Sequence, residues 1–216
     1  MAMTNEYFSL CKSYKEKYGV HTLLFMQVGS FFEVYSKTYD DLDMTNFTSI
    51  CDLKIANKPL GKDKLYMAGF RDYMIDKYIH KMNQNSDYTI IVYEQNEENG
   101  KIIRKCSGIF TPGSIFNDND KLSNHITCIW IHKTKKIFKE CYIFGICTMD
   151  SFTSSIYLNE YELPYYHNPT TYDEIEKHIS IYNPIELIIV HNIEKENIQS
   201  ILNFINHKSR KVQLIS

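Results

Sequence analysis

The chain has 216 residues, of which 44% are hydrophobic and 23% charged, and its net charge at pH 7 is −2. This composition is typical of a folded protein with one large or two small domains. The sequence contains neither an apolar run long enough to span a membrane nor the pattern of a secretory signal, so an intracellular protein is expected. The balanced charge excludes a protein that grips nucleic acid mainly through its phosphates.

The first half of the chain predicts a mixture of helices and strands. Residues 5–18 carry apolar side chains at helical spacing and are followed by Gly19, a common helix stop. The remaining predicted elements are strands at 22–28, 50–55, 65–69, 88–93 and 101–110, helices at 39–46 and 73–82, and a polar loop at 57–64. This half is therefore predicted to be a mixed-sheet α/β domain.

The second half predicts strands followed by an alternation of strand and helix. The most loop-like segment of the chain is IFNDNDKLSN, residues 115–124, which follows TPGS, and we place the domain boundary there. Beyond it, strands are predicted at 125–132, 141–149, 154–158 and 186–190, and helices at 172–181 and 194–206. The order of elements predicts a three-layer α/β domain with a mixed sheet.

The stretch VGSFFEVY, residues 28–35, places two phenylalanines and a glutamate directly after a glycine turn. Strict strand alternation puts Phe31, Glu33 and Tyr35 on one face and Phe32 and Val34 on the other. One phenylalanine thus shares a face with a charge. We therefore expect one of the two rings to lie outside the core.

Motifs that would indicate catalysis or metal binding are not found. The sequence has no phosphate-binding loop, no nucleophile elbow and no HExxH motif, and its six cysteines form no CxxC pair. Asp150 follows a predicted strand and could be imagined as a metal ligand of a nuclease. Metal-assisted phosphoryl chemistry needs several converging carboxylates, and no convincing partner is evident. No catalytic residue, metal site or cofactor is therefore predicted.

The pentapeptide Gly29-Ser30-Phe31-Phe32-Glu33 resembles the Phe-x-Glu motif of the DNA mismatch-repair MutS family, whose usual form is GDFYE. Further stretches resemble family motifs in the same order along the chain. They are YMAGF, VYEQ and FTPGS in the first half, and GICTMDSFTSSIYL and YNPIELIIV in the second. The resemblance covers nearly the whole chain.

The resemblance implies a mismatch-recognition domain over residues 1–118, a linker over 119–124 and a connector domain over 125–216. In this family the connector has an RNase H-like fold without nuclease function. The clamp and ATPase domains, with their ATP and Mg²⁺, would lie outside this chain. The implied partners are mismatched double-stranded DNA, the remaining MutS domains, a second MutS subunit and a downstream repair factor at the connector. No membrane is implied, and the nucleus, an organelle and a viral replication compartment are equally compatible.

The resemblance also implies roles for the motif residues. Phe31 would enter the minor groove and stack on the mispaired base, Glu33 would hydrogen-bond that base, and Gly29, Ser30 and Phe32 would support the motif. An apolar wedge partly unstacks a base step, at a cost that falls where pairing is already defective. An ionised carboxylate only accepts hydrogen bonds, so Glu33 facing a purine ring nitrogen would have to be protonated.

The sequence departs from the family pattern at several positions. Ser30 and Phe32 replace the commoner Asp and Tyr, Gln27 stands where many members carry Arg, and GFRDYM lacks the usual proline and histidine. These departures bear on the finer phosphate contacts and on mismatch preference. Together with the composition, they resemble the organellar or large-DNA-virus branches of the family.

Two alternatives to a mismatch-binding module remain open at this point. In the first, the chain is a non-sensing structural or partner-docking fragment, in which the phenylalanine pair merely fills the core. In the second, it is an RNase H-type nuclease, for which the carboxylate set is missing. The exposure of Phe31 distinguishes the mismatch-binding module from the first alternative, because a buried ring could not act as a wedge.

Overall fold

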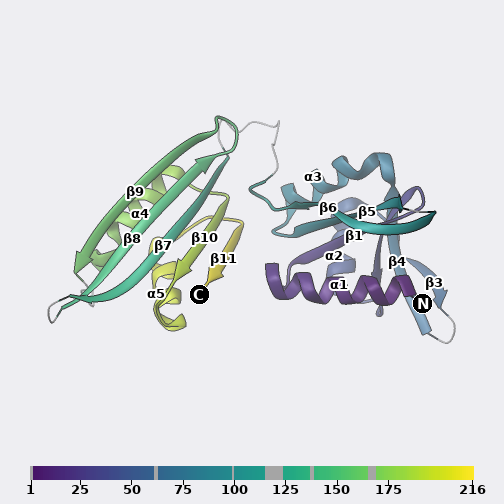
Figure 1. Cartoon of the computed structure of the whole chain (residues 1–216), viewed down its shortest axis with the longest axis horizontal. Coiled ribbons are helices and arrows are strands. Elements are labelled where there is room, and N and C mark those ends of the chain that lie inside the picture. The colour runs from purple at the N-terminus through teal and green to yellow at the C-terminus, as the bar shows by residue number, and fades with distance from the viewer. Residues whose placement is uncertain (1, 61–62, 99, 115–123, 137–138, 165–168) are drawn as a thin grey trace. The chain divides into compact units, whose positions relative to one another are not determined.

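A computed structural model describes residues 2–60, 63–98, 100–114, 124–136, 139–164 and 169–216. The chain divides into two compact units, Met1–Ile115 and Phe116–Ser216 (Figure 1). Each unit contains one mixed sheet, which confirms the predicted α/β class. Most of the predicted linker lies outside the described residues. No helix within the described part of the chain has the length and apolar character needed to cross a membrane.

The sheet of the first unit has six strands in the order β3-β4-β2-β1-β5-β6. Strand β1 pairs in parallel with β5, and all other neighbours are antiparallel. The strands are β1 (Thr22–Val28), β2 (Phe31–Ser36), β3 (Ala56–Leu60), β4 (Asp63–Arg71), β5 (Thr89–Glu98) and β6 (Lys101–Phe110). The helices are α1 (Ala2–Tyr18), α2 (Leu42–Cys51), α3 (Ile75–Asn85) and the 3₁₀ turn η1 (Asp72–Met74).

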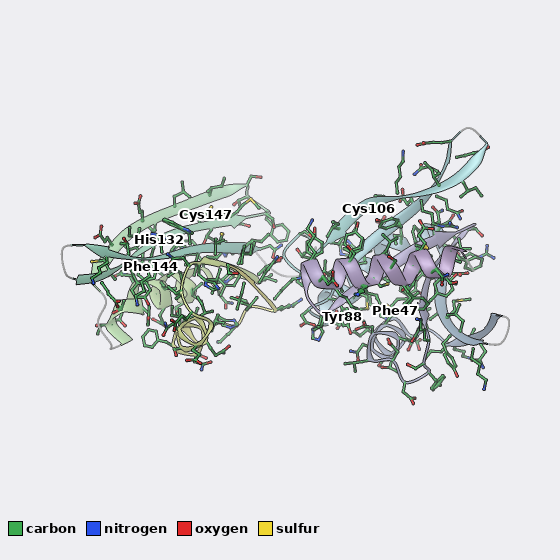
Figure 2. The ribbon with its side chains drawn as sticks, turned by 60° about the horizontal axis from the view of Figure 1, so that its bottom comes forward. Phe47, Tyr88, Cys106, His132, Phe144 and Cys147 are labelled. Carbon is green, nitrogen blue, oxygen red and sulfur yellow. The ribbon has the colours of Figure 1, made fainter. Side chains whose placement is uncertain are left out.

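Helices cover both faces of this sheet, and the strand residues alternate between the two resulting cores. Helix α1 packs on the face that carries Leu24, Met26 and Tyr35. Helices α2 and α3 pack on the opposite face, so that α1 and α3 lie on opposite sides of the sheet (Figure 1). Phe47 and Tyr88, which Figure 2 labels, belong to this second core. Because β1 is buried on both faces, it reads as a continuous apolar run.

Three predictions for the first unit are wrong, and all concern the segment between β2 and β4. The expected strand at 50–55 does not form: Ile50 and Cys51 end helix α2, and Asp52 closes it with a φ of +56°. The helix starts three residues later than predicted, at Leu42, because the side chain of Asp41 caps it through the backbone N–H of Met44.

The expected loop at 57–64 is instead part of the hairpin β3–β4, whose residues 61 and 62 lie outside the described part. Strand β3 is an edge strand, so it needs no buried face and tolerates Pro59 and lysine. Its polar sequence therefore resembles that of a loop.

The sheet of the second unit has five strands in the order β11-β10-β7-β8-β9. Strands β7, β8 and β9 form an antiparallel meander, and β10 and β11 add in parallel to β7. The strands are β7 (His125–Lys136), β8 (Lys139–Asp150), β9 (Ser155–Pro164), β10 (Glu186–His191) and β11 (Lys211–Ile215). The helices are α4 (Asp173–Tyr182), α5 (Lys195–Ile205) and the 3₁₀ turn η2 (Pro169–Tyr172).

This strand order is that of the predicted RNase H-like fold, although strand β11 was not predicted. β11 is a short edge strand with a partly exposed pattern. Helices α4 and α5 share one apolar core with the same face of the sheet. In the described residues the unit therefore has two layers, and the third layer expected from the sequence is not among them.

A buried polar network lies between this sheet and helix α4. His178 is 4% exposed, and Nδ2 of Asn159 lies 3.2 Å from its Nδ1. Its Nε2 lies 2.8 Å from Oγ1 of Thr148, which contacts Thr127 in turn. Asn159 donates to Nδ1, so the ring is neutral and donates from Nε2. Burial, and then the nearby His125, lower the pKa of His178 below its usual value.

We predict that the second unit loses stability as the pH falls below about 6.5, the ordinary pKa of histidine. Below this pH, His178 binds a proton in the unfolded chain but not in the folded unit. The free energy of unfolding therefore falls by up to about 1.4 kcal/mol per pH unit. Burial lowers the pKa of His207 as well, so it adds in the same direction. The measurement is urea unfolding between pH 7 and 5, followed by the fluorescence of the single tryptophan, Trp130, which lies in strand β7.

The variant His178→Gln should flatten this pH dependence, whereas His80→Gln, in helix α3 of the first unit, should leave it unchanged. A His178→Gln profile as steep as that of the wild-type protein would contradict the assignment.

Candidate nucleic-acid interface

The motif GSFFE lies at the hairpin between β1 and β2. The last pair of this hairpin joins Val28 and Phe31, so Gly29 and Ser30 form a two-residue turn. Gly29 has a φ of +61°, which a two-residue hairpin turn of type II′ requires at its first position. The backbone N–H of Gly29 donates to Oε1 of Gln95 at 3.0 Å. The turn is thereby tied to strand β5.

The two phenylalanines of the motif lie on opposite faces of the sheet, as strand alternation predicts. Phe32 is 2% exposed and stacks on Phe70 in the core beneath helices α2 and α3. Phe31 is 38% exposed. Only Phe31 is therefore available to a partner without unfolding the domain.

Glu33 shares the face of Phe31 but is not presented with it. Its side chain is 8% exposed, and the hydroxyl of Tyr35 donates a hydrogen bond to its Oε2. Burial, and then the Glu33 carboxylate, raise the pKa of Tyr35, which keeps this hydroxyl protonated. Of the two residues that the resemblance implies contact the base, only Phe31 is thus exposed.

Glu33 of strand β2 pairs directly with Gly69 of strand β4, a glycine that belongs to the stretch YMAGF. A Cβ atom added to Gly69 would lie 2.7 Å from the backbone oxygen of Phe32 and 3.3 Å from Cγ of Glu33. Backbone contact at 2.7 Å is not tolerated without a shift of the strand. The sequence needs glycine here because β2 and its glutamate approach β4 closely.

Phe31 lies in a row of directly paired residues that crosses five strands. Arg71 of β4 pairs with Phe31, and Phe31 pairs with Val28. The paired residues of β1 and β5 end at Met26 and Tyr93. Extending that register by two residues brings Val28 opposite Gln95, which pairs with Arg104 of β6. We call these five residues the Phe31 row. Because directly paired residues point to the same face, both arginines share the face of Phe31, one on each side of it.

The two arginines of the row contact the β1–β2 hairpin, Arg71 at the motif and Arg104 at Gln27 in strand β1. The guanidinium carbon of Arg71 lies 4.6 Å from the centre of the Phe31 ring, and its Nη1 makes a long contact of 3.5 Å with Oγ of Ser30. Nε of Arg104 donates to the backbone oxygen of Gln27 at 3.1 Å. Guanidinium groups suit phosphate recognition because they present several donors in one plane.

The sequence analysis did not single out either arginine. The row joins strands that are far apart in the chain, so no local pattern reveals it. One signal was available: the chain has only three arginines, and Arg71 and Arg104 are two of them.

Asp150, the conceivable metal ligand, has a structural role. Its carboxylate accepts hydrogen bonds from the backbone N–H groups of Asn124 and Phe152 and from the hydroxyl of Thr153. Burial alone would raise the pKa of Asp150, but these bonds hold it below its usual value. Across the described part of the chain, no three His, Cys, Asp or Glu side chains converge as a metal site would require.

Comparison with known proteins places the Phe31 row within a recognised domain. Residues 1–119 match the family model described as MutS domain I. The chain belongs to the MutS family. The entire Phe31 row lies inside the matched residues.

Two relatives extend the similarity to MutS proteins over most of the chain. A DNA mismatch repair mutS homolog of Acanthamoeba polyphaga mimivirus is 26% identical over 208 residues, which cover 90% of this chain and 18% of the relative. A DNA mismatch repair protein MutS of Clostridium kluyveri is 25% identical over 219 aligned residues, 97% of this chain and 22% of the relative. The chain thus spans about a fifth of the length of these relatives. The mimivirus protein agrees with the predicted resemblance to large-DNA-virus members.

We predict that Gly69→Ala destabilises the first unit by about 1–3 kcal/mol, the usual cost of forcing extra atoms into a packed site. The reason is the 2.7 Å approach of the new Cβ to the Phe32 oxygen. Calorimetric unfolding of the full chain measures the change.

The matched control is Gly145→Ala in β8, where an added Cβ would meet Trp130 at an ordinary 3.6 Å. Equal unfolding temperatures for Gly69→Ala and the wild-type protein would show that strand β4 accommodates the Cβ without strain.

Proposed function

We propose that the first unit is the mismatch-recognition module of a MutS-like DNA repair protein, and that Phe31 is its wedge. The observation that carries this proposal is the exposed ring of Phe31 at a hairpin tip, between two arginines, while its neighbour Phe32 is buried. Membership of the MutS family supports the substrate, mismatched double-stranded DNA.

The wedge works through the deformability of the duplex. The ring enters the minor groove and stacks on the mispaired base, which unstacks one base step and kinks the DNA. The step costs less where pairing is already defective, so the protein distinguishes mismatched from matched DNA without reading a base code.

The two arginines of the Phe31 row would place positive charge near the sugar–phosphate backbones on either side of the minor groove. Arg71 lies one strand spacing from Phe31 and Arg104 three spacings on the other side, about 5 and 14 Å in an ordinary sheet. The minor groove is about 6 Å wide, so a ring at its centre leaves the arginines outside it, near phosphates. Positive charge is thus local to the ring, as a chain with a net charge of −2 requires.

Glu33 is proposed to hydrogen-bond the stacked base. Its burial and its bond to Tyr35 mean that it acts beneath the ring, and that the carboxyl is held in one orientation before DNA arrives. If the base presents a ring nitrogen acceptor, Glu33 must carry a proton in the complex.

The second unit is proposed to be the connector that links recognition to the clamp and ATPase domains of a complete MutS and to a downstream repair factor. Its RNase H-like strand order supports this assignment. The partners would then include a second MutS subunit, and ATP with Mg²⁺ would belong to the ATPase domain. No catalytic residue is assigned in this chain.

The burial of Glu33 favours one alternative, a non-sensing structural or partner-docking fragment in which the motif stabilises the hairpin only. The exposure of Phe31 opposes it, because a ring that merely filled the core would lie inside, as Phe32 does.

We predict that Phe31→Ala abolishes the preference for mismatched DNA. Base–aromatic stacking contributes about 1–3 kcal/mol, so binding to a mismatched duplex should weaken by roughly five- to 150-fold. The measurement is fluorescence anisotropy of matched and mismatched duplexes at one fixed low salt concentration. Low salt is needed because the near-neutral chain releases few counterions.

The control is Phe32→Leu, which changes the buried neighbour and should lower stability while retaining the mismatch preference of the folded protein. An equal loss on both duplexes for Phe31→Ala would contradict a mismatch-specific role and favour the structural alternative.

We predict that Glu33→Gln leaves mismatch binding almost unchanged, because glutamine donates a hydrogen bond as a protonated carboxyl does. Tyr35→Phe serves as a companion variant that removes the donor to Glu33 without changing the charge. A large loss of mismatch affinity in Glu33→Gln alone would show that Glu33 acts as an ionised acceptor.

A further inference from the structure

The wedge role of Phe31 does not explain one contact of the interface. The Phe31 ring, which is proposed to stack on a base, is already covered by the guanidinium of Arg71. Arg71 lies 4.6 Å from the centre of Phe31, within the range of a cation–π interaction. This contact follows from the sheet register, since Arg71 is the direct cross-strand partner of Phe31. Arg71 belongs to the stretch GFRDYM, which lacks the proline and histidine usual in the family pattern.

Few other interactions hold Arg71 against the Phe31 ring, so this contact can break at little cost. Arg71 is exposed, and its other polar contact is the long one to Ser30 Oγ at 3.5 Å. No acidic side chain of the described residues forms an ion pair with it. An exposed cation–π contact is weak, and a base that stacks on the ring competes with the guanidinium for the ring surface. The displaced charge remains on strand β4, next to the insertion point.

We propose that Arg71 covers the Phe31 ring in the free protein and moves to a flanking DNA phosphate when the ring inserts. The inference rests on the proposed wedge role of Phe31 and adds a second residue to it. Arg71 then has two effects. It shields an exposed aromatic ring from water before binding, and it converts ring insertion into a new charge-assisted contact with the backbone.

The first part of the test examines the free protein. The ring current of Phe31 should shift the Cδ protons of Arg71 upfield in the NMR spectrum, and Phe31→Leu should remove that shift. On saturation with a mismatched duplex, the shift should disappear from the wild-type protein as well. A shift that is absent in the free protein, or that persists in the mismatched complex, would overturn the inference.

The second part measures binding of Arg71→Gln to matched and mismatched duplexes over a range of salt concentrations. Loss of a phosphate contact that forms on ring insertion should weaken binding to the mismatched duplex several-fold and make its slope of log K against log salt shallower by about 0.9. The loss on the matched duplex should be smaller, because the ring inserts less readily where pairing is intact.

The matched control is Lys77→Gln in helix α3, which removes the same charge. Lys77 also lies over an aromatic ring, with Nζ 5.9 Å from the centre of Tyr78, but α3 packs on the opposite face of the sheet. An Arg71→Gln protein that binds like Lys77→Gln, with the same salt slope, would refute the role of Arg71.

The two proposals fail in different ways. If Phe31→Ala loses the mismatch preference but Arg71→Gln keeps the wild-type affinity and salt slope, only the inference on Arg71 fails. If Phe31→Ala retains the wild-type preference for the mismatched duplex in the anisotropy measurement, the wedge role of Phe31 fails, and the inference fails with it.

Discussion

The register of the β1–β2 hairpin is the constraint on which the candidate interface depends. With a turn of two residues, Val28 must pair with Phe31, and every side chain of β2 is assigned to a face. A slip by one residue would bury Phe31 and expose Phe32, because side chains alternate along a strand. Gly29 makes this turn possible through its positive φ, and its N–H bond to Gln95 ties the tip to β5. The exposure of one ring is therefore a consequence of backbone geometry.

The same register brings together residues that the chain keeps far apart. Strand β4 can lie against β2 because Gly69 leaves room for the backbone of Phe32, and this pairing ends with Arg71 opposite Phe31. Strand β6 reaches the row from the other side through β5 and contributes Arg104. The stretches YMAGF and GSFFE thus belong to one structural unit, in which one glycine fixes the turn and the other fixes the spacing between strands.

The elements that could be predicted from the sequence are those whose pattern is set by burial. Strand β1 was predicted with its exact bounds because it is apolar on both faces, and the separation of Phe31 from Phe32 followed from alternation. Edge strand β3 has a polar sequence that contains a proline, and edge strand β11 is short and partly exposed, so neither was recognised. The burial of Glu33 and the positions of the two arginines could not be foreseen, since they depend on pairing between distant strands.

The near-neutral charge of the chain and the composition of the Phe31 row fit together. A protein that held DNA through many phosphates would bind matched and mismatched duplexes almost equally, because phosphate contacts do not report on pairing. Here two of only three arginines stand in one row with the exposed ring, while the net charge stays at −2. On the proposed wedge role, much of the binding energy of this surface would therefore be tied to insertion of the ring, and insertion is the step whose cost depends on the quality of base pairing. Under this proposal, discrimination would follow from having little affinity that is independent of that step.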